Sequence, residues 1–217
     1  MPRPIRSRPR SWFASFRLLG CLSLMTLACL AGCDGGSGVH SEDEARRAYL
    51  GLDVSIDLAV DLGLRGFNDA KSANIPPESG AGALAGTMTV TGQVDQGASD
   101  NKQMRLLVAM VGYSDVAHLV YATGAASSGA GGAGGTTEAP PTLDMSLKAI
   151  PTGTLSGQLV GTFQMSGDLA GPVTLSLAFT ADLASDGAGG TMRKVGTTHI
   201  TGTATSPPGT YAVDVTR

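Results

Sequence analysis

The strongest constraint on the fold is a seven-residue pattern, G-T-x-x-h-[ST]-G with h apolar, that occurs three times along the chain. The copies span residues 86–92, 161–167 and 196–202. In each copy the second, fourth and sixth residues are polar and the fifth is apolar, as in a β-strand with one solvated face. The apolar residues that we expect to point into the core are Met88, Val90, Phe163, Met165 and Ile200. Because the copies are unevenly spaced, they indicate repeated hairpin geometry rather than a solenoid or propeller of fixed period.

An apolar segment follows each copy after a short turn, which predicts three β-hairpins. These second segments are 104–111, 173–179 and 211–215, and a further apolar segment spans 143–150. Segment 104–111 is apolar at most positions, so we expect it to be a central strand covered on both faces. The segments together predict a mainly β fold, an antiparallel sandwich or barrel-like sheet of about seven strands.

Residues 41–73 are predicted to form an N-terminal helix packed on this sheet. Ser41 and Glu44 have the spacing of a capping box, in which the serine oxygen accepts a hydrogen bond from a free backbone N–H of the first turn. Residues 50–64 alternate between apolar and polar, which favours a strand. The segment is long for a strand and contains few β-branched residues, which favours a helix. Both interpretations stay open, and we favour the helix.

Two segments have the composition of connections within a single domain that spans residues 41–217. Residues 74–85 contain Pro76-Pro77 and scattered glycines, so we expect a connection without regular structure there. Residues 122–142 are rich in Gly and Ala and offer few side chains for packing, which predicts a surface loop inserted into the domain.

The N-terminal segment 1–33 has the features of an export signal. Five arginines and no acidic residue precede a short apolar run that ends in Leu30-Ala31-Gly32-Cys33. These four residues resemble the lipobox of bacterial lipoproteins. The resemblance implies that a signal peptidase recognises Leu30, Ala31 and Gly32 and removes residues 1–32. It also implies that Cys33 carries a diacylglyceryl lipid, with acyl chains such as palmitate, ahead of a flexible tether, residues 33–40.

The lipobox resemblance implies a location and restricts the partners. The domain is expected in the cell envelope, anchored to a membrane through lipidated Cys33 on the non-cytoplasmic side, with the inner and outer membranes both open. Removal of the signal would leave ten basic residues against eighteen acidic ones, a formal net charge of −8. A surface of this charge disfavours nucleic acid as a partner. Since Cys21 and Cys29 would leave with the signal, no disulfide is expected.

Motifs that carry chemistry are missing from the sequence. It contains no G-x-S-x-G, no phosphate-binding G-x-x-x-x-G-K and no H-E-x-x-H, so we expect neither catalytic residues nor a cofactor. Three groups of side chains have the chemistry of metal-binding or catalytic groups: the histidines, for which no metal is expected, an oxygen-rich segment that we interpret as a solvated turn rather than a calcium site, and an acidic series that we interpret as a solvated helix face. They are His40, His118 and His199; Asp95, Ser99, Asp100 and Asn101; and Asp53, Asp57 and Asp61.

These observations favour a non-enzymatic lipoprotein whose β domain has a structural or adaptor role, with another envelope protein as its partner. The alternative is a small-ligand or lipid-binding β-barrel lipoprotein. Four methionines could line an adaptable cavity in that alternative, although core packing is their ordinary role. They are Met104, Met110, Met145 and Met165.

Overall fold

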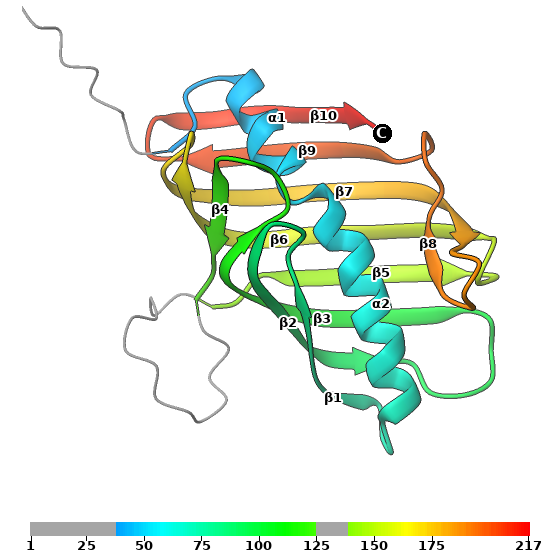
Figure 1. The fold of residues 1–217 in the computed structure, drawn as a ribbon. Helices are drawn as coiled ribbons and strands as arrows, with labels where there is room; N and C mark the ends of the chain where they lie inside the picture. Colours follow the sequence, from blue (N-terminus) through cyan, green and yellow to red (C-terminus); the bar gives the residue numbers. More distant parts are fainter. Residues whose placement is uncertain (1–37, 125–138) are drawn as a thin grey trace, which may run out of the picture. The chain divides into compact units, whose positions relative to one another are not determined.

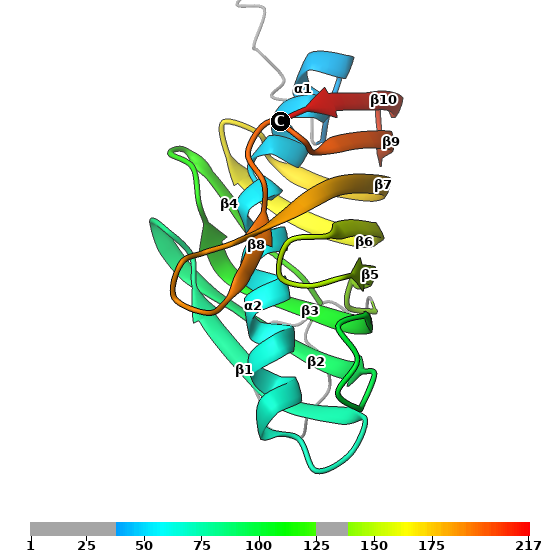
Figure 2. The same cartoon turned by 90° about the vertical axis from the view of Figure 1, so that its right-hand side faces the viewer.

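The computed structural model describes residues 38–124 and 139–217. The lipobox residues Leu30, Ala31, Gly32 and Cys33 lie outside the described residues, as does most of the Gly/Ala-rich segment. The described chain is mainly β, as the sequence predicts: one antiparallel sheet with helices packed on one of its faces (Figures 1 and 2).

The helices and strands occur in the following order, in the part of the chain that the structure describes. They are α1 (Glu42–Leu50), α2 (Asp53–Asp69), β1 (Asn74–Ala81), β2 (Ala85–Val94), β3 (Lys102–Ser114), β4 (Leu119–Ala122), β5 (Thr142–Lys148), β6 (Thr154–Gly167), β7 (Gly171–Ser185), β8 (Thr191–Arg193), β9 (His199–Ser206) and β10 (Gly209–Thr216). The ten strands exceed the seven predicted, because β1, β4 and β8 have no clear pattern in the sequence.

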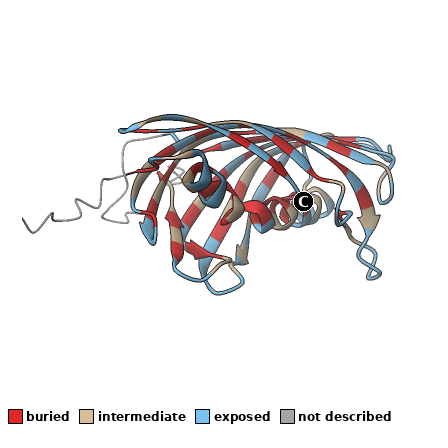
Figure 3. Cartoon of the chain, turned by 90° about the horizontal axis from the view of Figure 1, so that it is seen from above, coloured by how far each residue is buried: buried red, intermediate tan, exposed pale blue. Residues whose placement is uncertain are grey.

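Neighbouring strands follow the order β1-β2-β3-β4-β6-β7-β9-β10, with β5 paired to both β3 and β6 and β8 paired to β7. The sheet is open, with β1 and β10 at its edges. It curves around the helices, so that the helices rather than a second sheet cover its apolar face (Figure 3).

The three copies of the repeat have the predicted one-sided burial, although β9 begins only at His199, the fourth residue of the third copy. Each contributes to the first strand of a hairpin, β2–β3, β6–β7 or β9–β10. All five apolar positions are buried, whereas polar positions such as Thr87 and Ser166 on the other face are exposed. The glycines that bound the copies have positive φ, and a Cβ at Gly92 or Gly202 would overlap a carbonyl oxygen of the neighbouring strand. Glycine is therefore required where these strands depart from regular geometry.

The Gly/Ala-rich segment interrupts a strand. Strands β4 and β5 both pair antiparallel with β3 and with β6, at opposite ends of these two strands. At the interruption, β3 is bonded to the flanks of the segment, where Val108 N–H donates to Pro141 O and Thr123 N–H donates to Met110 O. The segment is thus an insertion between two halves of one strand position, which explains why the surrounding sheet is continuous.

The helix prediction for residues 50–64 is confirmed, and Ser41 caps the first helix. The Ser41 Oγ accepts a hydrogen bond from Glu44 N–H at 3.2 Å, while the Glu44 carboxylate accepts one from His40 N–H at 2.7 Å. A short break at Gly51 and Leu52 separates α1 from α2. A Cβ at Gly51 would overlap the Tyr121 hydroxyl, which donates to Ala48 O at 2.7 Å, so this glycine lets the helices approach β4. No helix of the described residues is long and apolar enough to cross a membrane.

Two expectations about the sheet are wrong. Strand β3 is covered on one face only, because Leu107 and Val111 are 37% and 72% exposed. Residues 74–81 form β1 instead of an unstructured connection. This strand accommodates Pro76 and Pro77 because it lies at the edge of the sheet, where a missing N–H breaks no ladder, and its register shifts between Ile75 and Glu78.

Candidate functional site

The uncovered face of the sheet is the broadest candidate for a binding surface, and we call it the outer face. Its side chains alternate with the buried ones along every long strand and are mainly hydroxyl and amide groups. One row of four threonines crosses β6, β7, β9 and β10 in register: Thr162, Thr174, Thr205 and Thr210. The hydroxyls of Thr162 and Thr174 lie 2.8 Å apart, and those of Thr205 and Thr210 lie 2.9 Å apart. The outer face is therefore polar with few charges, and suited to many weak hydrogen bonds.

A shallow depression of about 490 Å³ lies in this face over β3, β5, β6 and β7. Its side chains combine a basic group, an acidic group, amides, hydroxyls and one small apolar residue. They are Gln103, Arg105, Asp144, Ser146, Ser156, Gln158, Ala178 and Thr180. The Gln103 amide donates to Ser146 Oγ at 2.8 Å and the Arg105 guanidinium donates to Gln93 Oε1 at 3.3 Å. These bonds orient Gln103 and Arg105 on β3, and the exposed Ala178 adds a small side chain from β7 to the lining.

Exposed apolar side chains add a second kind of contact to the outer face. Leu107 and Val160 both pair with Thr142, so the three residues form a continuous cross-strand row. Val111 extends the apolar surface along β3 toward the end of that strand. An outer face with both hydrogen-bonding and apolar positions resembles the rim and centre of protein interfaces more than it resembles a catalytic cleft.

A buried charge cluster joins α2 to β8, and it revises the interpretation of the acidic series as a solvated face. The Arg193 guanidinium donates to Asp53 Oδ1 at 3.0 Å and to both carboxylate oxygens of Asp57 at 2.9 Å. Side-chain exposure is 5% for Arg193 and 9% for Asp53, and Asp57 is half-buried. Only Asp61 behaves as predicted, in an exposed pair with Arg65 one helical turn away. The sequence could not reveal Arg193, because it lies about 140 residues from its partners.

The protonation states of this cluster are fixed by its surroundings. Burial, and then the nearby Asp53 charge and hydrogen bond, raise the pKa of Tyr49, whose hydroxyl donates to Asp53 Oδ1. Burial alone would lower the pKa of Arg193, but its hydrogen bonds and charge interactions with Asp57 and Asp53 outweigh burial and raise it. Tyr49 thus stays neutral and Arg193 stays charged at ordinary pH. All three guanidinium nitrogens of Arg193 donate to Asp53 or Asp57, so the cluster is a structural clamp between α2 and β8.

The histidines and the oxygen-rich segment do not come together in a common site. His199 lies on the outer face, 3.1 Å from the exposed Asp214, and His118 lies in the turn before β4. In the oxygen-rich segment, Asn101 Oδ1 accepts a hydrogen bond from Ala149 N–H and Asp100 O accepts one from Ile150 N–H, so both oxygens hold the β5–β6 turn. Within residues 38–124 and 139–217, no group of three or more His, Cys, Asp or Glu side chains is placed to hold a metal ion.

The four methionines belong to the core between sheet and helices. Met104, Met110, Met145 and Met165 are each at most 4% exposed. The sulfur of Met104 faces Gly63 of α2, where an added Cβ would lie 3.0 Å away. The helix therefore occupies the position over these methionines in which a ligand of a hollow β-barrel would lie.

Comparisons of the chain with protein families, with curated proteins and with solved structures give no match.

Proposed function

We propose that this chain is a lipid-anchored envelope protein whose β domain is not catalytic and binds another envelope component through the outer face. The main support for this proposal is the contrast between the two faces of the sheet. The helix side is packed with apolar side chains, and no buried side-chain N or O atom among the described residues lacks a hydrogen-bond partner. The outer face has a depression, a hydroxyl array and exposed apolar side chains, and it is covered by nothing in the described chain. Binding energy is thus available on the outer face.

The position of the tether supports the same proposal. Gly38 N–H donates to Ala170 O, and Val39 N–H donates to Ser206 Oγ, so the tether joins the domain at the β6–β7 and β9–β10 turns. Four residues lie between Cys33 and Gly38, so the two ends of this segment are five residue steps apart, which allows a reach of roughly 17 Å. A lipid on Cys33 would hold these turns close to the membrane.

The anchor is tested by replacing the cysteine. Cys33→Ala is expected to abolish incorporation of labelled fatty acid and to leave the precursor uncut, because the peptidase of the lipobox type acts after the thiol is modified. Gel mobility and palmitate labelling measure the two effects, with Cys29→Ala as the matched control that stays lipidated. Normal labelling and processing of Cys33→Ala would refute the anchor.

The outer face is tested at the depression. Ala178→Arg fills it with a large cation, and we expect at least tenfold less partner recovered after crosslinking in intact envelopes. Unfolding free energy should change by only about 0.5 kcal/mol, since the residue is exposed on a strand. Val195→Arg is the control, because Val195 is 89% exposed and lies beyond β8, on the helix side. Equal recovery with Ala178→Arg and the wild type would exclude the depression as the binding surface.

A further inference from the structure

A buried lysine with no anionic partner lies at the end of the core, away from the outer face. Lys102 begins β3 and is 4% exposed. Its ammonium donates to Gly97 O at 2.6 Å and lies 4.2 Å from the centre of the Phe67 ring. Among the described residues, no carboxylate lies within 4.0 Å of it, whereas the equally buried Arg193 has two. Buried charges are ordinarily paired, so this ammonium is undercompensated.

The neighbours of Lys102 compensate the positive charge of its ammonium only in part. A carbonyl oxygen and an aromatic face each supply partial negative charge. Phe67 lies in the last turns of α2, whose carboxyl end carries about half a negative charge. An ammonium has three N–H donors, and the structure gives hydrogen-bonding partners to one of them.

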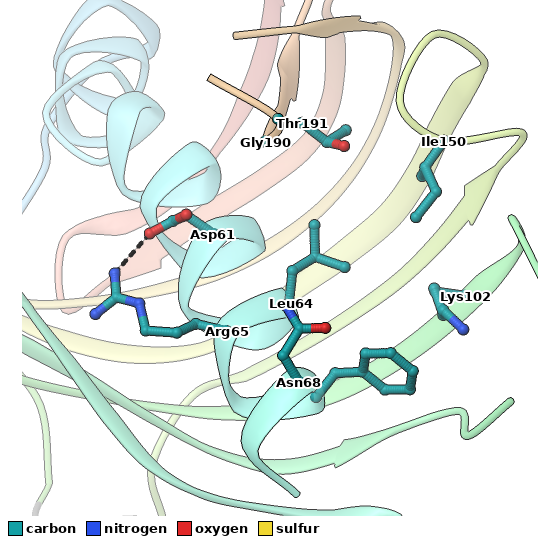
Figure 4. Close-up of a pocket in the computed structure, with 10 residues that line it drawn as sticks. Asp61, Leu64, Arg65, Asn68, Lys102, Ile150, Gly190 and Thr191 are labelled. Atoms are coloured by element: carbon teal, nitrogen blue, oxygen red, sulfur yellow. Dashed lines mark hydrogen bonds and ion pairs between the residues drawn. The ribbon is translucent and has the colours of Figure 1, made fainter. Parts of the chain in front are cut away.

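Lys102 lines a pocket of about 340 Å³ between α2, β3, the β5–β6 turn and the β7–β8 turn (Figure 4). Leu64 and Ile150 project toward one another across it, and Phe67 is a third apolar side chain of the lining. Asn68 and Thr191 add polar groups to the lining. The other cation of the lining, Arg65, is paired with Asp61 at 2.7 Å and its guanidinium lies on the far side of α2 from Lys102. One buried cation therefore faces a small, mostly apolar space.

We propose that this pocket binds a small amphipathic carboxylate, with the carboxylate on the Lys102 ammonium and the hydrocarbon part against Leu64, Phe67 and Ile150. A single charge on the ligand fits because the lining has a single cation without a carboxylate partner, Arg65 being already paired with Asp61. The volume is near the lower end of ligand pockets, about 300 to 1,000 Å³, which limits the ligand to a short chain. The proposal is independent of the lipid anchor and of the outer face.

The test uses octanoate as the probe and lysine side-chain NMR as the readout. The full chain contains four lysines, Lys71, Lys102, Lys148 and Lys194, so selectively labelled protein gives four assignable side-chain signals. Octanoate is expected to shift the Lys102 signal alone, in a saturable manner. Acetate lacks the tail and 1-octanol lacks the charge, and both should bind at least tenfold more weakly.

Two variants complete the test. Lys102→Met keeps the length of the side chain without its charge, and we expect at least tenfold weaker octanoate binding. Lys148→Met removes a lysine from the outer face and should bind octanoate as the wild type does. Should Lys102→Met fail to fold, the wild-type NMR titration decides alone. The proposal would be overturned if octanoate did not shift the Lys102 signal, or if Lys102→Met bound octanoate as tightly as the wild type. Lys102 would then have only a structural role, in holding the β2–β3 loop through Gly97 O.

Discussion

Met165→Asp is expected to abolish folding of the β domain, whereas Gln164→Asp at the adjacent position should be tolerated. Met165 is 4% exposed on the helix side of β6, opposite Tyr121 of β4. A carboxylate there would be buried without a partner and would lose the apolar contacts of the methionine, at a cost of several kcal/mol. Domains of this kind are stable by about 5–15 kcal/mol in total, so little stability would remain. Thermal melts measured by circular dichroism give the comparison.

The adjacent residue supplies the control for this substitution. Gln164 is half-buried on the outer face, beside Ala122 and Pro172 in the register, so a new charge there keeps part of its contact with water. Its cost should be within about 1 kcal/mol. Ile200→Asp and Thr201→Asp repeat the comparison on β9, where Ile200 is fully buried and Thr201 is exposed. Equal losses of stability within either pair would contradict the one-sided burial of that strand.

Arg193→Met is expected to be the most destabilising change outside the apolar core, with a cost of about 3–5 kcal/mol. The substitution leaves Asp53 buried and Asp57 half-buried without the guanidinium that binds both of them. It also removes the guanidinium bonds that join β8 to α2, and keeps the backbone N–H of residue 193, which donates to Asp57 Oδ1 at 3.2 Å. Chemical denaturation monitored by Tyr fluorescence measures the loss, and amide exchange in α2 should rise in parallel.

Two further variants separate the clamp from a general effect of losing an arginine. Arg65→Met removes an exposed helical pair and should cost about 0.5 kcal/mol or less. Combining Arg193→Met with Asp53→Asn and Asp57→Asn removes the uncompensated charges, so the combined variant should be more stable than Arg193→Met alone. A loss for Arg193→Met no larger than that for Arg65→Met would show that the buried cluster contributes no net stability.

The sequence predicted the class of the fold because alternation within a strand is a local property. Five apolar positions of the repeat were assigned to the core and all are buried, since the side chain of every second strand residue must face the same way. The cap at Ser41 was also predictable, because a serine followed by a glutamate three residues later satisfies backbone groups within one turn. Strand β1 was missed because the two prolines mask an edge strand, and β8 because three residues carry no detectable period.

The burial of the charged residues could not be predicted from the sequence. The series Asp53, Asp57 and Asp61 has the spacing of one helical face, which in isolation favours exposure to water. Its first two members are covered instead by β8, whose Arg193 supplies the opposite charge. Nothing in the sequence predicted that Lys102 is buried, since a lysine at the start of a strand is ordinarily exposed.

Local order along this chain was therefore set by the sequence: which residues form strands, which of their faces is apolar, and where the first helix begins. The tertiary structure alone decided that the strands form one open sheet with helices on a single face, that β4 and β5 share one strand position, and which charges are buried together. The physical reason is that periodicity and capping depend on neighbours within one or two turns. The assembly of the open sheet depends on pairings between residues tens of positions apart, such as Arg105 with Asp144, and the pairing of Arg193 with Asp53 spans 140 positions. The geometry of both exists only after the chain has folded.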